Sequence, residues 1–194
     1  MKKADLLADY FTLIVLNTTL CCQLECYNGF YMSNKVKRLF QELQPTHYKL
    51  HIKPMREKAT FSGEITISAK KSGRPNKRIT LHQKGLTVTS ATIKYVDKKG
   101  AMTNIAVDRI NTHDTFDEIR LHTETMLYPG IYEITVHFEG KITPAMNGMY
   151  PCNFEIDGQK KSLIATQFES HHAREVFPCV DEPEAKATFD LTLT

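Results

Sequence analysis

Apolar and polar residues alternate along most of the chain after Thr46. The clearest run is 132–138 (YEITVHF), and shorter runs lie at 48–52, 64–68, 86–88, 93–95, 105–107 and 119–121. A period of two places successive side chains on opposite faces of a β-strand. Each run therefore predicts a strand with one buried face and one exposed face.

Turn-forming residues separate these runs. They lie at 71–75 (KSGRP), 97–100 (DKKG), 128–130 (YPG) and 157–158 (DG). Short alternating strands joined by such turns favour an antiparallel β-sandwich or barrel. No long helical pattern follows Pro45, which disfavours a doubly wound nucleotide-binding fold.

One short helix is predicted before the strands, at 33–43 (SNKVKRLFQEL). A capping-type Ser or Asn begins this segment, and Val36, Leu39, Phe40 and Leu43 share one helical face. Pro45 is expected to end the helix. The sequence thus predicts a mainly β protein with a short N-terminal helix.

Residues 1–44 form an N-terminal extension of uncertain status. Its apolar run, 10–16, falls far short of the roughly 20 residues that span a bilayer. The basic start at Lys2 and Lys3 is offset by Asp5 and Asp9, which disfavours a secretory signal. We therefore expect no membrane span, and a cytoplasmic rather than a secreted location.

Composition narrows the function classes. Hydrophobic residues make up 41% and charged residues 24%, as in soluble globular proteins. The net charge of +3 without a long basic stripe disfavours nucleic-acid binding. Five irregularly spaced cysteines favour free thiols over a disulfide framework. The cluster Cys21, Cys22 and Cys26 lacks further ligands at the spacing of a zinc site.

The histidines and cysteines do not form a catalytic motif. None of the eight histidines belongs to His-Glu-x-x-His, and the nearest segment, 122–126 (HTETM), lacks the adjacent glutamate and the second histidine. Adjacent residues such as His171 and His172 diverge, so they rarely chelate one ion. Cys179 lies near them, but its apolar neighbours Phe177 and Pro178 favour a buried structural thiol over a nucleophile. We expect no catalytic residue and no metal ligand.

Gln167 and Glu169 are the candidate site residues. If 165–170 (ATQFES) is a strand, they share a face and Phe168 points the other way. A carboxylate and an amide oxygen side by side suit a cationic ammonium group. From the spacing alone, two ordinary solvated side chains on an exposed strand are the favoured interpretation.

The block 166–189 (TQFESHHAREVFPCVDEPEAKATF) closely resembles the N-terminal domain of the aminopeptidase N family of zinc metallopeptidases. Smaller likenesses lie at 45–50 (PTHYKL), 61–65 (FSGEI), 81–82 (LH), 130–140 (GIYEITVHFEG) and 148–150 (GMY). The resemblance covers 45–194 and implies the family's saddle-shaped antiparallel β-sandwich. It departs from the family at His171 and His172, where many members have Thr-Asp.

The resemblance also implies roles for single residues. It implies that Gln167 and Glu169 line the substrate cleft and that Glu169 helps to bind the free α-amino group of a peptide. It marks Arg174 and Asp181 as structural, and we expect them to pair and brace the turn around Pro178 and Pro183. The alternative is that both side chains are solvated.

The family's Gly-x-Met-Glu-Asn and His-Glu-x-x-His segments are absent from the 194 residues. We therefore expect the N-terminal domain of a zinc aminopeptidase, present as a fragment. It would contribute to peptide binding beside a downstream catalytic domain that holds the zinc, and it would be inactive alone. The alternative is a stand-alone β-sandwich binding or interaction module without peptidase activity; a hydrolase that uses Cys179 is remote.

Overall fold

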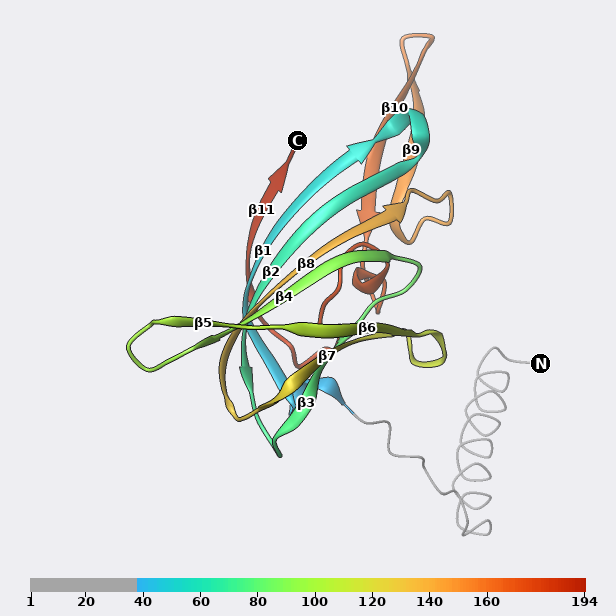
Figure 1. Ribbon diagram of the computed structural model, residues 1–194. Helices are drawn as coiled ribbons and strands as arrows, with labels where there is room; N and C mark the ends of the chain where they lie inside the picture. Colours follow the sequence, from blue (N-terminus) through green and yellow to red (C-terminus); the bar gives the residue numbers. More distant parts are fainter. Residues whose placement is uncertain (1–37) are drawn as a thin grey trace, which may run out of the picture. The chain divides into compact units, whose positions relative to one another are not determined.

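The computed structural model describes residues 38–194 (Figure 1). The apolar run 10–16, the cysteines at 21, 22 and 26, and the first part of the predicted helix lie outside the described residues. No helix within 38–194 is long and apolar enough to cross a membrane.

The described strands form three sheets. The largest has the order β11 (Thr188–Leu193), β1 (Leu43–Met55), β2 (Thr60–Lys71), β8 (Gly130–Lys141), β4 (Thr87–Val96) and β5 (Met102–Ile105). A three-stranded sheet has the order β3 (Asn76–His82), β7 (Glu118–Leu127) and β6 (Val107–His113). The third sheet is the hairpin of β9 (Gly148–Ile156) and β10 (Gln159–Gln167), which projects beyond the other strands. Four single 3₁₀ turns complete the list: η1 (Leu39–Gln41), η2 (Arg56–Lys58), η3 (Asp114–Phe116) and η4 (Ala173–Glu175).

The prediction of a mainly β protein is confirmed. In β8 the alternate residues Tyr132, Ile134, Val136 and Phe138 are each 2% exposed or less. The predicted turns also lie between strands, and Gly73, Gly100 and Gly158 all have positive φ angles that favour glycine.

Three predicted runs are organised differently. The run 93–95 and the last two residues of the run 86–88 belong to the single strand β4. A bulge between Val88 and Ser90 reverses which of its residues face the core. Conversely, Ile105 ends β5 and Val107 begins β6 in another sheet, so the predicted strand 105–107 is wrong.

The expectation of a purely antiparallel sheet is also wrong at one edge. Strand β11 lies parallel to β1, with Tyr48 opposite Phe189 and Ile52 opposite Leu193. The chain reaches this edge by crossing from β10 through the segment 168–187, so it can run in the direction of β1. Strand β9 was not among the predicted runs, although half-buried Tyr150, Cys152 and Phe154 alternate there with exposed residues.

The predicted helix is not confirmed. Only the 3₁₀ turn η1 lies in its described part, and β1 begins at Leu43, before Pro45. The Glu182 carboxylate accepts hydrogen bonds from the backbone N–H of Leu39 (2.7 Å) and of Phe40 (3.4 Å). Leu43 then pairs with Lys71 of β2. Tertiary partners thus outweigh the local helical pattern.

Two phenylalanines pack over two glycines between β2 and β8. The register places Phe61 opposite Gly140 and Gly63 opposite Phe138. A Cβ atom at Gly140 would lie 2.2 Å from Phe61 Cζ, and one at Gly63 would lie 2.5 Å from Phe138 Cζ. Neither position has room for a larger residue, which explains the glycines in 61–65 and 130–140.

Candidate substrate-binding site

The candidate pair lies where the β9–β10 hairpin ends. Gln167 is the last residue of β10 and pairs with Gly148 of β9. Glu169 lies in the turn that follows β10. The prediction that Gln167 and Glu169 share one face of a strand is therefore wrong. Both side chains are exposed, whereas Phe168 between them is half-buried and packs edge-on against Phe177 (ring centroids 5.7 Å apart).

The turn after Glu169 folds back onto the base of the hairpin. The His172 N–H donates to the Phe168 carbonyl (2.8 Å), and the turn continues into η4. Gly148 has a φ of +63°, and a Cβ atom there would lie 3.2 Å from Glu175 Cβ. The segment after Glu169 thus packs directly against the strand that pairs with Gln167.

Arg174 and Asp181 form the brace that the sequence predicts. Arg174 Nε donates to Asp181 Oδ2 (3.0 Å) and Nη2 donates to the Asp181 carbonyl (3.1 Å). Both side chains are mostly buried. Arg174 Nη1 also lies 3.8 Å from Asp117 Oδ2 in the turn before β7. This second partner links the braced loop to the three-stranded sheet.

His82 holds the same loop from the end of β3. The backbone N–H of His82 donates to the Cys179 carbonyl (2.7 Å), and the backbone N–H of Cys179 donates to the His82 carbonyl (3.1 Å). Its Nδ1 accepts the Asp181 N–H (3.0 Å), so this nitrogen carries no proton. Burial, assisted by the Arg174 charge, lowers the pKa of His82. The side chain is therefore a neutral acceptor.

Tyr48 of β1 is the third anchor. Its hydroxyl oxygen accepts the Val180 N–H (3.2 Å), and its ring stacks on Phe189 of β11 at 4.7 Å. Burial raises the pKa of Tyr48 well above its usual range, so the phenol stays neutral. The motifs at 45–50, 81–82 and 166–189, distant in sequence, thus meet at this loop. The sequence pointed to Tyr48 and His82 only through these likenesses.

Cys179 is a structural thiol, as predicted. It is buried, and burial raises its pKa, which suppresses the reactive thiolate. Its backbone pairs with His82 rather than with His171 or His172. The prediction that His171 and His172 diverge is wrong, because their imidazoles stack on one another (centroids 4.8 Å apart). His172 Nδ1 lies 3.1 Å from Glu175 Oε1.

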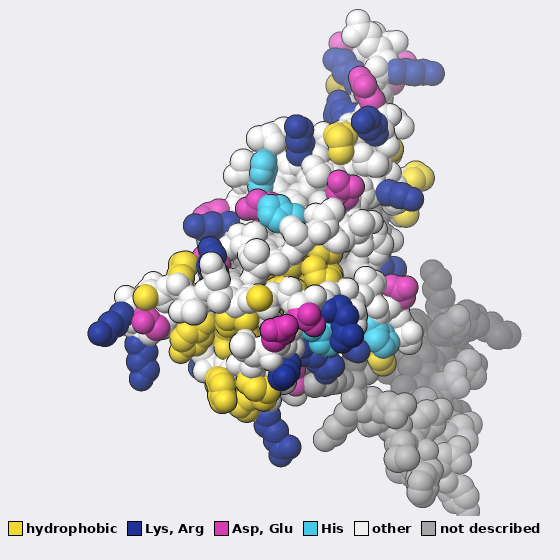
Figure 2. All heavy atoms as spheres, viewed as in Figure 1, with side chains coloured by type: hydrophobic (Ala, Val, Ile, Leu, Met, Phe, Trp, Pro, Cys, Tyr) yellow, Lys and Arg dark blue, Asp and Glu magenta, His cyan; other side chains and the backbone are white. Residues whose placement is uncertain are grey.

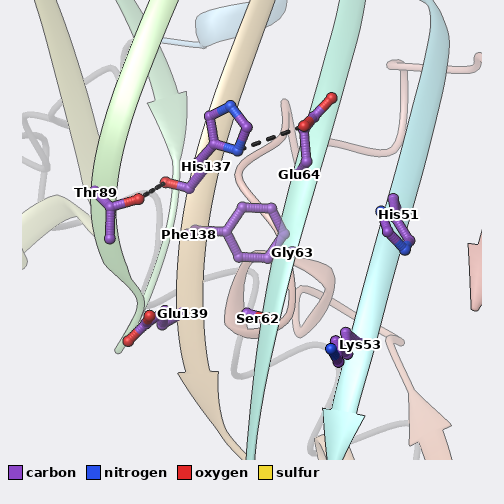
Figure 3. A pocket seen from close by; sticks show the side chains of 9 residues that line it. All are labelled: His51, Lys53, Ser62, Gly63, Glu64, Thr89, His137, Phe138 and Glu139. Atoms are coloured by element: carbon purple, nitrogen blue, oxygen red, sulfur yellow. Dashed lines mark hydrogen bonds and ion pairs between the residues drawn. The ribbon is translucent and has the colours of Figure 1, made fainter. Parts of the chain in front are cut away.

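The described part of the chain holds no group of three His, Cys, Asp or Glu side chains placed to bind a metal ion. A cavity of about 310 Å³ opens on the polar face of the six-stranded sheet, and neither Gln167 nor Glu169 lines it (Figure 3). Within it the His137 side chain is directed at Glu64, with Nδ1 3.5 Å from Oε2. Both side chains are half-exposed, and such ion pairs contribute little. We do not assign a site there.

Comparison with known proteins identifies the family. Residues 44–194 match the family model described as the peptidase M1 N-terminal domain. The chain therefore belongs to the M1 peptidases and contains their N-terminal domain, in agreement with the resemblance at 166–189.

The relatives are aminopeptidases. Aminopeptidase N of Lactococcus lactis subsp. lactis is 39% identical over 163 residues, which cover 84% of this chain and 17% of the relative. Aminopeptidase N of Lactobacillus delbrueckii subsp. lactis is 38% identical over 81% of this chain and 17% of its own length. Human glutamyl aminopeptidase is 32% identical over 81% of this chain and 16% of its own length. The chain thus spans about one sixth of the relatives that it matches.

Proposed function

We propose that this chain is the part of a zinc aminopeptidase that helps to hold the α-amino group of a peptide substrate, through Gln167 and Glu169. The observation that carries the proposal is an exposed carboxylate, Glu169, on a turn that the His172 N–H closes onto the Phe168 carbonyl. This turn leads directly into the loop that Arg174 and His82 hold through Asp181. A peptide α-amine is cationic below a pKa of about 8, so a fixed carboxylate can orient it. Buried anchors hold the loop that follows this turn, which keeps the cost of ordering the turn low.

The partner in this proposal is a downstream catalytic domain. Phe189, Leu191 and Leu193 lie on the same sheet face as the buried Tyr48, Leu50 and Ile52, yet they are 52%, 60% and 62% exposed. An uncovered apolar row that continues a core typically marks an interface. We propose that the catalytic domain covers this row and completes the cleft around Gln167 and Glu169.

Zinc belongs to that catalytic domain in this proposal. The 194 residues lack the His-Glu-x-x-His helix that would supply two ligands and the general base. When bound, the metal supplies an activated water. This chain would only position the substrate, so we propose that it hydrolyses nothing alone.

Three further expectations complete the proposal. Residues 1–44 form an extension and 45–194 form the domain. The six-stranded and three-stranded sheets make the family's saddle-shaped sandwich. The protein works in the cytoplasm, where the free, buried thiol of Cys179 stays reduced. The stand-alone binding module is not favoured, because residues 44–194 match the N-terminal domain of M1 peptidases and the chain covers about one sixth of the aminopeptidases that it matches.

The test is a chimera. Residues 44–194 replace the matching segment of the Lactococcus lactis aminopeptidase N, and hydrolysis of an aminoacyl p-nitroanilide is measured with zinc. We expect an active chimera, and Glu169→Gln is expected to lower kcat/KM at least about tenfold because the amine loses its charged acceptor. Glu155→Gln, on the exposed far part of β9, is the matched control and should change it less than about twofold.

Two results would contradict the proposal. One is an active chimera in which Glu169→Gln and Glu155→Gln behave alike. The other is turnover by the 194-residue chain alone that survives repurification and is lost in Glu169→Gln.

A further inference from the structure

Three strand connections lie side by side at one end of the six-stranded sheet. The register places Lys70 opposite Ile131, Ile131 opposite Val96, and Val96 opposite Met102. Residues 70–77, 96–103 and 124–131 therefore form a continuous region, which we call the three-loop surface. It lies at the start of β8, whereas the base of the β9–β10 hairpin follows the end of β8.

Large apolar side chains of the three-loop surface face solvent. Ile131 and Met102 both flank Val96, so they stand on one face of the sheet. The Tyr132 hydroxyl donates to the Tyr128 carbonyl (2.7 Å), which ties down the turn that carries Tyr128. The exposed apolar residues are all more than two-fifths accessible: Met102, Met126, Tyr128 and Ile131. A group of this kind on a soluble domain typically marks a contact surface.

Cationic side chains surround these apolar residues. Figure 2 shows dark-blue Lys and Arg side chains projecting around hydrophobic ones below β5. The exposed cations, none of which is in an ion pair within residues 38–194, are Lys70, Arg74, Lys77, Lys98 and Lys99.

Few carboxylates oppose these cations. The sequence of the three loops contains only Asp97 and Glu124. Asp97 Oδ1 accepts the N–H groups of Lys99 and Ala101 (2.8 Å each), so this carboxylate is used within its own turn. That turn fixes Lys98 and Lys99 at the tip of the β4–β5 hairpin, and only Glu124 remains as an exposed counter-charge.

We propose that the three-loop surface docks on an anionic lipid surface. Lys and Arg side chains are attracted by anionic headgroups, each strengthening binding about fivefold near the membrane. Tyrosine and aliphatic side chains enter the interfacial region beside them. An acidic protein segment would satisfy the cations but would leave the four apolar side chains without a role. This proposal is independent of Gln167 and Glu169.

The experiment is vesicle co-sedimentation of the 194-residue chain. Vesicles of phosphatidylcholine with about 30% phosphatidylserine are compared with vesicles of phosphatidylcholine alone. We expect binding to the anionic vesicles at about 0.1 M salt, at least tenfold weaker binding to neutral ones, and a clear loss at about 1 M salt because the charges are screened. Polyglutamate, added as a competitor, tests for an acidic partner.

Matched variants test whether vesicle binding depends on the three-loop surface. Lys98→Glu with Lys99→Glu should weaken binding to anionic vesicles at least about tenfold. The control is Lys160→Glu with Lys161→Glu, the same charge change on exposed residues of β10, with an expected effect below about twofold. Met102→Ser with Tyr128→Ser should weaken binding at both salt concentrations. All variants share residues 1–37, so differences between them report the three-loop surface. Circular dichroism checks that each is folded.

Each remaining outcome overturns the proposal. These are no binding to anionic vesicles, equal losses in the two lysine pairs, full binding by the Met102→Ser/Tyr128→Ser variant, and tighter binding to polyglutamate than to vesicles.

Discussion

Strands β8 and β11 carry the same alternation of apolar and polar residues but differ in burial. The alternating residues Tyr132, Ile134, Val136 and Phe138 of β8 are almost fully buried, whereas Phe189, Leu191 and Leu193 of β11 are more than half exposed. Both rows lie on the core side of one sheet. Alternation therefore tells which side chains share a face, and it does not tell whether anything covers that face.

The largest expected effect tests this contrast directly. Ile134→Ala should lower the free energy of unfolding by about 4 kcal/mol, because it removes a fully buried side chain and leaves a cavity. Leu191→Ala should cost less than about 1 kcal/mol in this chain, since Leu191 is already in water. Urea denaturation measures both. In the chimera with a catalytic domain the Leu191→Ala cost should rise; a cost that stays small there would contradict our assignment of the interface.

The next effect concerns the loop that leads to β11. Arg174→Met should lower the free energy of unfolding, measured by urea denaturation, by about 3 kcal/mol. The reason is that it leaves the mostly buried Asp181 carboxylate without its charged partner. Combined with Asp181→Asn, the loss should be clearly smaller than the sum of the two single losses. Simple additivity in this double-mutant cycle would show that the pair does not act as a brace.

A smaller effect tests the closed packing between β2 and β8. Gly140→Ala should cost about 2 kcal/mol because its Cβ atom would overlap the Phe61 ring. Phe61→Leu should recover part of this loss in the double variant, as it removes the overlapping ring atoms. Thr192→Ala on the exposed β11 is the control, and it should change the free energy of unfolding by no more than about 0.5 kcal/mol. Failure of Phe61→Leu to compensate would argue against the phenylalanine–glycine contact.

The smallest effect is a pH dependence. Burial lowers the pKa of His82 in the folded state, while the unfolded chain titrates near 6.5. The unfolded state then binds more protons below that pH, so stability falls as the pH drops from about 7 towards the folded pKa of His82. His82→Asn, which keeps an acceptor for the Asp181 N–H, should flatten this slope by about 1 kcal/mol per pH unit or less. If the stability of the unmodified chain and that of the His82→Asn variant change with pH in parallel, His82 is not the source of this pH dependence.

Much of the candidate site was predictable, but its geometry was not. The family block identified Gln167, Glu169 and the Arg174–Asp181 pair, and the pair is present. The position of Glu169 was predicted incorrectly, because β10 ends at Gln167 where its partner β9 begins. Strand ends depend on the pairing partner, which a single run of residues does not specify.

The sequence by itself determined the local features: the alternation in β1, β2 and β8, the glycine-rich turns, and the buried character of Cys179. These follow from the chemistry of neighbouring residues, which acts at short range. Only the tertiary structure decided that β1 begins at Leu43 in place of the predicted helix, that β11 runs parallel to β1, and that Tyr48, His82 and Arg174 meet at one loop. Such contacts join residues far apart in the chain, so no local pattern encodes them.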